Sequence, residues 1–165
     1  MDIRRIFEYA LQREQEGLRF FSEYAQRGQR SSAAGVFQQL VNEEQAHIAF
    51  IERLLSKITS GEEVTADSVA EETMGKADWF EQRARSENIE QRIAEEVVPD
   101  LAALRMAYLI EQDLADFYRQ SASGCEGKAR DAFELLARWE TEHARLFKAL
   151  HDRAYNVYMQ MPWGG

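Results

Sequence analysis

Apolar residues recur at helical spacing in four stretches of the chain, and each stretch is bounded by residues that begin or end helices. Short turns inside two pairs of stretches predict two antiparallel helical hairpins, over residues 2–58 and 100–155. Residues 59–99 are more polar and only weakly amphipathic, which predicts a long crossover containing a short helix. Residues 156–165 form a tail. The pattern therefore predicts a single all-α domain over residues 1–165, a four-helix bundle of two hairpins joined by a long crossover.

The two predicted hairpins also resemble each other in sequence. Glu14 and Glu111 are separated by 97 positions (111 minus 14), and apolar residues around them match at the same offset. Glu44 and Glu140 are separated by 96 positions (140 minus 44), again among matching apolar residues. One hairpin thus looks like a duplicate of the other.

Four glutamates stand on the apolar faces of the predicted helices: Glu14, Glu44, Glu111 and Glu140. Each has a large apolar or aromatic residue seven positions before it and seven after it, so each occupies a core-facing position. An ionised carboxylate in a bundle interior is costly unless a positive charge meets it, and no lysine or arginine lies on these faces. Two divalent cations supply a charge of +4 against the −4 of the four acids. The pattern therefore predicts a pair of metal ions.

Two histidines complete the candidate site. His47 follows Glu44 by three residues and His143 follows Glu140 by three, a spacing that returns to nearly the same helix face. One ExxH motif is a weak signal, whereas two at matching repeat positions, each beside an inward glutamate, are typical of di-metal carboxylate bundles. Oxygen-rich sites with one imidazole per ion favour two iron ions, with manganese or zinc as substitutes. The competing interpretation is a metal-free network of protonated acids and neutral histidines, which leaves many inward groups to satisfy.

Charge and composition exclude several other classes. The formal net charge of −9 argues against nucleic acid or an anionic membrane as partner. No apolar run approaches the length of a membrane span, and the charged residues after Met1 favour the cytoplasm over export. The single Cys125 excludes an internal disulfide and a CxxC pair for zinc or a rubredoxin-type iron centre.

At these residues the chain resembles the rubrerythrin branch of the ferritin-like superfamily, over residues 2–57 and 100–153. The segments that carry the resemblance are EQEGLRFF and EEQAH in the first half and EQDLADFY and ETEH in the second. The resemblance implies a division of roles among the six residues. In this division, Glu44 and Glu140 bridge the two irons. Glu14 and Glu111 each bind one iron terminally, and His47 and His143 bind one iron each.

Two positions depart from the family pattern. Rubrerythrins proper carry a further glutamate one turn after the third-helix ligand, where this chain has Leu114, and a rubredoxin domain whose cysteines this chain lacks. Several relatives have a tyrosine seven residues after the first ligand, where this chain has Phe21. Tyr118 keeps the hydroxyl in the second half, and Tyr118 and Tyr108 are either hydrogen-bond donors to ligand carboxylates or core aromatics. His151 is expected to be a helix-end residue and not a ligand.

The leading functional prediction is a redox enzyme that reacts with hydrogen peroxide or dioxygen at a di-iron centre and is reduced again by an external electron donor. A ferroxidase or iron-handling protein uses the same residues and is the first alternative. The second alternative is a non-catalytic binding module whose metals only stabilise the bundle. Family analogy also predicts a homodimer, supported by residues 59–99.

Overall fold

The structure, a computed structural model, describes residues 2–27, 32–60 and 101–161. These residues form four helices and no strand: α1 (Ile3–Arg27), α2 (Ser32–Ser60), α6 (Leu101–Ser123) and α7 (Gly127–Gln160). The predicted all-α fold is confirmed. Residues 61–100, where the short crossover helix is expected, lie outside the described residues.

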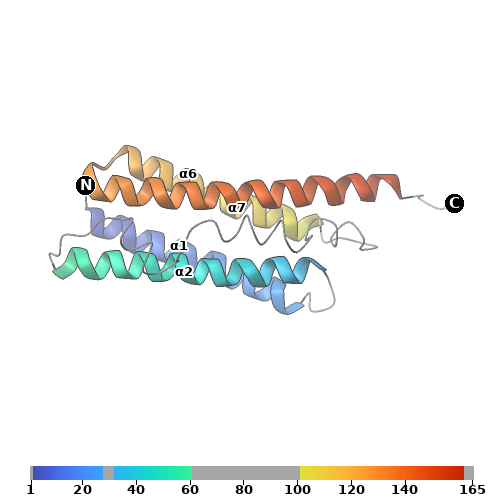
Figure 1. The fold of residues 1–165 in the computed structure, drawn as a ribbon, viewed down its shortest axis with the longest axis horizontal. Helices are drawn as coiled ribbons and strands as arrows, with labels where there is room; N and C mark the ends of the chain where they lie inside the picture. The colour runs from blue at the N-terminus through green and yellow to red at the C-terminus, as the bar shows by residue number, and fades with distance from the viewer. Residues whose placement is uncertain (1, 28–31, 61–100, 162–165) are drawn as a thin grey trace.

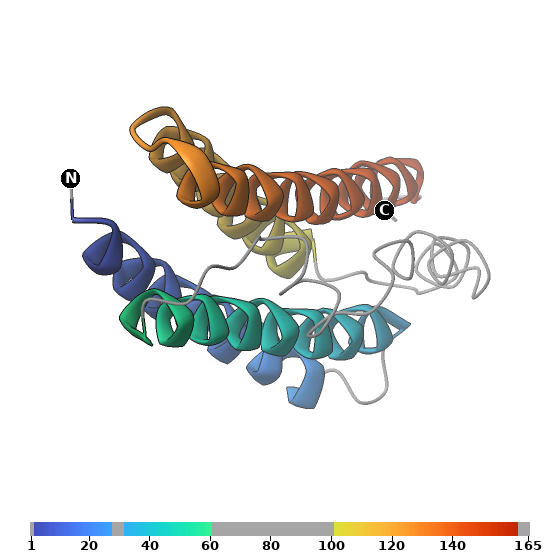
Figure 2. The ribbon, with the colours of Figure 1, turned by 60° about the vertical axis from the view of Figure 1, so that its left-hand side comes forward.

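The helices form two antiparallel hairpins, α1 with α2 and α6 with α7 (Figure 1). The colour gradient shows that α1 and α7 run in one direction, whereas α2 and α6 run in the other. Because α2 and α6 are parallel, α6 begins at the end of the bundle where α2 begins (Figure 1), and no tight turn can join the two helices. Figure 2 shows the hairpins as two layers that face each other. This is the connectivity of a ferritin-like four-helix bundle.

Local chemistry accounts for the helix ends. The carboxylate of Asp2 accepts a hydrogen bond of 3.4 Å from the backbone N–H of Arg5, which caps the start of α1. The chain enters α7 at Gly127, whose φ of +57° is a left-handed conformation that glycine adopts without steric cost.

The last helix is longer than its sequence pattern predicts, because α7 continues past Tyr155 to Gln160. Residues 156–160 contain neither glycine nor proline. The break comes at Met161, which has extended backbone angles (φ −65°, ψ 134°) and precedes Pro162. A proline disfavours the helical conformation of the residue before it, so α7 ends directly before Met161.

Two hydrophobic clusters fill the interior, and each contains residues from both hairpins. In one cluster Phe7 of α1 stacks on Phe133 of α7, with ring centroids 4.3 Å apart. In the other, Phe21 of α1 stacks on Phe147 of α7 at 6.2 Å. Burial of each such side chain stabilises the fold by about 1.5–3 kcal/mol. Since Glu14 lies between Phe7 and Phe21 along α1, the clusters close the bundle at either side of the acidic positions.

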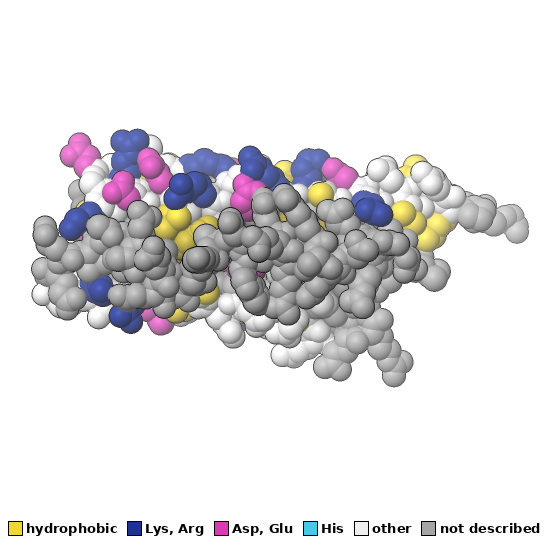
Figure 3. Space-filling model, viewed as in Figure 1, with side chains coloured by type: hydrophobic (Ala, Val, Ile, Leu, Met, Phe, Trp, Pro, Cys, Tyr) yellow, Lys and Arg dark blue, Asp and Glu magenta, His cyan; other side chains and the backbone are white. Residues whose placement is uncertain are grey.

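The exposed edge along α6 and α7 is charged but mixed in sign. Figure 3 shows Lys and Arg side chains interspersed with Asp and Glu along this edge. Several of them form helical ion pairs, such as Arg130 with Glu134 at 2.8 Å. None of the four described helices is both long and apolar enough to cross a lipid bilayer.

Candidate metal centre

All six predicted metal-binding residues lie in the interior of the bundle. The four glutamates and His47 have no exposed surface, and His143 is 3% exposed. The helices α1 and α6 each contribute one glutamate, while α2 and α7 each contribute a glutamate and a histidine. Their large apolar neighbours seven residues away are packed into the two clusters, and this packing turns the acids inward.

The imidazole of His47 points its Nδ1 atom at three of the acids. This atom lies 2.8 Å from Glu140 Oε1 across the hairpin interface. It lies 3.7 Å from Glu14 Oε2 and 3.8 Å from Glu44 Oε1. His47 therefore shares its surroundings with the glutamates of its own hairpin and with one from the other.

His143 occupies the equivalent place in the second hairpin. Its Nδ1 lies 3.3 Å from Glu140 Oε2 and 3.5 Å from Glu111 Oε2. The same atom is 3.7 Å from Glu44 Oε1 across the interface. Glu44 and Glu140 thus lie close to both histidines, whereas Glu14 lies beside His47 and Glu111 beside His143.

Four of these residues form a buried metal-binding group: Glu44, His47, Glu140 and His143. Each offers one ligand atom, and these atoms all lie within 4.8 Å of one another. Carboxylate oxygens combined with imidazole nitrogens suit iron, manganese or zinc. The group is consistent with a di-iron site.

Unpaired polar atoms show that the site fits bound cations. Within the described ranges, these buried atoms have no hydrogen-bond partner: both oxygens of Glu44, Glu111 and Glu140, Oε2 of Glu14 and both ring nitrogens of His47. The 2.8 Å approach of His47 to Glu140 is therefore close but not aligned as a hydrogen bond. Buried polar atoms are almost always paired, and leaving one unpaired costs about 1–3 kcal/mol. Cations placed among these atoms would satisfy them together, so the residues fit the implied metal pair.

Without metal, Glu44 and Glu111 are expected to retain protons. Burial, reinforced by the charge of Glu14, raises the pKa of Glu44 well above its ordinary value. Burial and the charge of Glu140 likewise raise the pKa of Glu111. Protonation removes the repulsion among carboxylates that would otherwise face one another in a site of low dielectric constant.

The histidines retain protons for the opposite reason. Burial is the largest single influence on the pKa of His47 and lowers it, but the neighbouring Glu140 and Glu14 together outweigh burial and raise the pKa to about 10. At His143 burial is likewise outweighed by its acidic neighbours together, Glu111 foremost, and the pKa is raised. Burial opposes ionisation of Glu140, yet the two histidines together bring its pKa well below the ordinary value. In the metal-free protein, protons thus occupy the centre, and metal must displace them.

The structure brings one of the two candidate tyrosines to the cluster. Tyr118 is fully buried, and its hydroxyl donates a hydrogen bond to Glu14 Oε1. Burial and the charge of Glu14 raise the pKa of Tyr118 well above its ordinary value, so the hydroxyl stays a donor. Tyr108 is half-buried and lines a small surface pocket beside Lys148. In the parts of the chain that are described, its hydroxyl forms no hydrogen bond to the inward acids.

Two neighbours of the cluster were not anticipated from the sequence. Glu43 accepts a hydrogen bond from Nε2 of His143 at 3.1 Å. Trp139 stacks on His47, with ring centroids 5.2 Å apart and an angle of 10° between the planes. Glu43 and Trp139 directly precede the glutamates of the two ExxH motifs and are equivalent in the internal repeat (139 minus 43 is 96). Comparing the residue before each motif could have singled them out.

Three other positions that the sequence singled out have the surroundings that the helix pattern predicts: Leu114, Phe21 and His151. Leu114, at the position of the family's further glutamate, is buried in a hydrophobic cluster. Phe21 is buried in the other cluster. His151 lies toward the end of α7, where its Nδ1 is 3.3 Å from Asp152 and its ring stacks on Tyr155.

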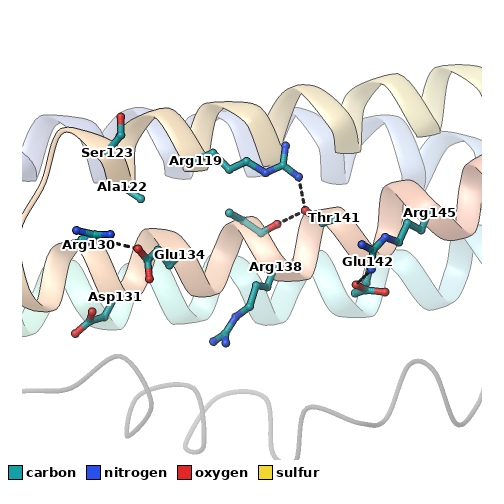
Figure 4. Close-up of a pocket in the computed structure, with 11 residues that line it drawn as sticks. Arg119, Ala122, Ser123, Arg130, Asp131, Glu134, Arg138, Thr141, Glu142 and Arg145 are labelled. Carbon is teal, nitrogen blue, oxygen red and sulfur yellow. Dashed lines mark hydrogen bonds and ion pairs between the residues drawn. The ribbon is translucent and has the colours of Figure 1, made fainter.

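A surface pocket of about 790 Å³ lies on α6 and α7, and none of the six inward residues lines it. Figure 4 shows the guanidinium group of Arg119 directed at Thr141, whose hydroxyl oxygen lies 2.6 Å away. Arg130 is paired with Glu134 in the same view. These arginines are engaged within the protein, and the pocket does not define the functional site.

Comparison with known protein families agrees with the fold and the cluster. The rubrerythrin family model matches residues 5–151, a range that includes all six inward residues. The chain belongs to the rubrerythrin family. Comparisons with curated proteins and with solved structures give no significant match.

Proposed function

We propose that this protein is a di-iron oxidoreductase of the rubrerythrin type that reacts with hydrogen peroxide or dioxygen. The observation that carries the proposal is the convergence of four buried glutamates and two buried histidines, most of whose ligand atoms lack hydrogen-bond partners among the described residues. Membership of the rubrerythrin family supports it. A buried set of this charge has no evident structural use without cations.

The geometry suggests how the six residues would hold two ions. Glu14 and His47 would bind one iron, because their ligand atoms are 3.7 Å apart. Glu111 and His143, at 3.5 Å, would bind the other. The glutamates that lie near both histidines, Glu44 and Glu140, would bridge. Manganese or zinc could replace iron in such a set.

The protein contributes position, charge and exclusion of water. Bound iron would supply the electrons that reduce the oxidant. The four carboxylates would offset the cationic charge, and the two hydrophobic clusters keep bulk water from the ends of the site. Tyr118 holds one oxygen of Glu14 by a hydrogen bond and leaves Oε2 directed at the cluster.

The proposal is tested by loading metal-free protein with Fe(II) under anaerobic conditions and mixing it with dioxygen or hydrogen peroxide in a stopped-flow spectrometer. We expect two irons per chain by metal analysis and a rapid absorbance change with at least one oxidant. Glu14→Gln should lower both the iron content and the rate. Glu8→Gln, an exposed position on the same helix, is the matched control and should change neither.

Each contrary result points to a definite alternative. Protein that binds no iron contradicts the proposal outright. Protein that binds two irons but does not react is a metal-stapled binding module. Iron that is released to a chelator after oxidation is a substrate, and the protein is then a ferroxidase or an iron carrier.

We also propose an external electron donor and a homodimer. The 165 residues contain a single cysteine and therefore no rubredoxin-type cysteine set that could reduce the centre. Without added donor, the loaded protein should complete one turnover and stop. Size-exclusion chromatography with light scattering tests the dimer.

A further inference from the structure

The outer nitrogens of the two histidines differ in their hydrogen-bond partners. Nε2 of His143 donates a hydrogen bond of 3.1 Å to the carboxylate of Glu43. For Nε2 of His47 no hydrogen-bond acceptor is found among the residues described, and the indole of Trp139 stacks nearly parallel on the face of this imidazole. Since Glu43 and Trp139 are repeat-equivalent, the duplicated halves carry different kinds of residue at this position.

A second pair of repeat-equivalent positions also distinguishes the two halves. Tyr118 donates a hydrogen bond to Oε1 of Glu14 and so withdraws part of that carboxylate's charge. The equivalent of Tyr118 in the first hairpin is Phe21 (118 minus 21 is 97), which has no hydroxyl to offer. Both oxygens of Glu111 accordingly have no hydrogen-bond partner in the described ranges and are available to a cation.

We propose that the two metal positions are unequal: the position beside Glu111 and His143 binds a divalent metal ion more tightly than the position beside Glu14 and His47. Glu43 is the positioning residue that creates most of the difference. This inference rests on the proposed function, because it presupposes the metal pair.

The physical basis is the second hydrogen bond of a metal-binding imidazole. A carboxylate that accepts the outer N–H fixes which ring nitrogen carries the proton, holds the ring in place and makes the inner nitrogen a stronger donor to metal. Loss of such a partner typically costs about 10–100-fold in metal affinity. Glu43 gives this support to His143, whereas Trp139, the repeat equivalent beside His47, has an indole N–H that can only donate and so offers no acceptor for the outer N–H of His47.

Stepwise binding constants of the wild type do not suffice as a test, since the first cation repels the second even at identical positions. The test therefore uses two variants that each keep one position. Glu14→Ala retains the position at His143, and Glu111→Ala retains the position at His47. Anaerobic calorimetric titration with Fe(II) should give a dissociation constant at least about tenfold lower for Glu14→Ala than for Glu111→Ala.

The contribution of Glu43 is measured in the Glu14→Ala background. Adding Glu43→Gln, which keeps the side-chain size but removes the charge, should weaken Fe(II) binding to about the level of Glu111→Ala. Glu52→Gln, an exposed position on the same helix, is the matched control and should have no effect. A second readout uses Zn(II)-loaded protein in which Glu43→Gln is the only substitution. In nitrogen-15-resolved NMR spectra, the proton on Nε2 of His143 should resonate upfield of its wild-type position, which a loss of packing elsewhere would not produce.

The outcomes separate this inference from the proposed function. A wild type that binds two ions, with equal affinities in Glu14→Ala and Glu111→Ala, overturns the inference and leaves the metal pair in place. The inference is also overturned if Glu43→Gln leaves the affinity of the His143 position unchanged. A wild type that binds no metal overturns both.

Discussion

The first hairpin and the second direct the same residue types at the centre of the bundle but surround them with different neighbours. Each half supplies two inward glutamates and one histidine, all buried. Around them, a carboxylate in one half corresponds to an indole in the other, and a tyrosine in one to a phenylalanine in the other. The two halves thus share their inward acids and histidine and differ in the residues that touch them. Under the proposed inequality of the metal positions, these neighbours would adjust each position separately.

A third difference concerns the space beside the acids. Gly17 is buried on α1, and a Cβ atom at this position would lie 4.0 Å from Glu44 Oε2. Its repeat equivalent is Leu114 (114 minus 17 is 97), which is buried in a hydrophobic cluster. At this pair of positions the first half therefore has a glycine where the second half has a large apolar side chain.

The largest effect is expected from removing a residue that both halves share. Glu140 approaches His47 at 2.8 Å and His143 at 3.3 Å, so Glu140→Ala should remove one of the two ligands that both metal ions would share. Metal content should fall below one ion per chain. With metal at 1,000 times the dissociation constant, the lost stabilisation is about 4 kcal/mol. Metal analysis and urea unfolding, with and without added Fe(II), measure the two effects.

Glu134→Ala on the exposed side of α7 is the control for this variant and should keep its metal. A Glu140→Ala protein that still binds two ions would show that the two halves bind metal independently.

Raising the pH should destabilise the metal-free protein. His47 has a pKa of about 10 in the folded state against 6.5 ordinarily, so its contribution to stability is complete below pH 6.5 and is lost as the pH rises through about 10. The raised pKa values of Glu44 and Glu111 act in the same direction, since their contribution is present below pH 4.5 and lost above it. Glu140, whose pKa is lowered, contributes above pH 4.5 and loses its contribution only on acidification.

The measurement is denaturant unfolding of chelator-treated protein between pH 6.5 and 10. The free energy of unfolding should fall by several kcal/mol, at about 1.4 kcal/mol per unit of pKa difference. Metal-loaded protein should not show this fall, because cations replace the protons. An equal fall in both forms would indicate that the metals do not occupy the place of those protons.

Trp139→Glu should make the two halves more alike by giving His47 a carboxylate at the position equivalent to Glu43. In the Glu111→Ala background, Fe(II) affinity should rise by about tenfold, the lower end of the effect of such partners. Trp139→Gln loses the same indole without gaining the charge and is the matched control. Calorimetric titration measures both, and equal affinities in the two variants would argue against the role assigned to the carboxylate.

The smallest effect is expected at the tyrosine. Tyr118→Phe removes the hydrogen bond to Glu14 and should destabilise the metal-loaded protein by about 1 kcal/mol while leaving the metal content at two. Phe21→Tyr offers a hydroxyl at the equivalent position of the other half and should weaken the Glu111 position slightly. Urea unfolding measures the first effect and Fe(II) titration in the Glu14→Ala background the second. A large loss of metal in Tyr118→Phe would give the hydroxyl a more direct role.

The four helices and the inward placement of the acids could be predicted because both follow from local periodicity. Glu14 stands among aromatic residues seven positions away on each side, and a helix must bury that face. The end of α7 was missed because the apolar stripe fades near Tyr155. The helix itself continues to Gln160 and stops only at Met161, the residue before a proline.

Contacts across the hairpin interface could not be predicted from one sequence. Glu43 and His143 are 100 residues apart, and in the sequence a glutamate beside another glutamate looks like ordinary helix surface. Tyr118 and Tyr108 are both near Glu111 in sequence, but only the packing of α6 against α1 decides that Tyr118 reaches Glu14. Such pairings depend on how two helices are rotated against each other.

The central claim is that the six inward residues hold two metal ions between the hairpins. Anomalous diffraction from crystals of the iron-loaded protein, recorded on both sides of the iron absorption edge, tests it most directly. We expect two iron peaks inside the bundle, one beside Glu14 and His47 and one beside Glu111 and His143, with Glu44 and Glu140 between them. Iron-soaked crystals with no peak among these residues, or with the glutamates turned into solvent, would contradict it.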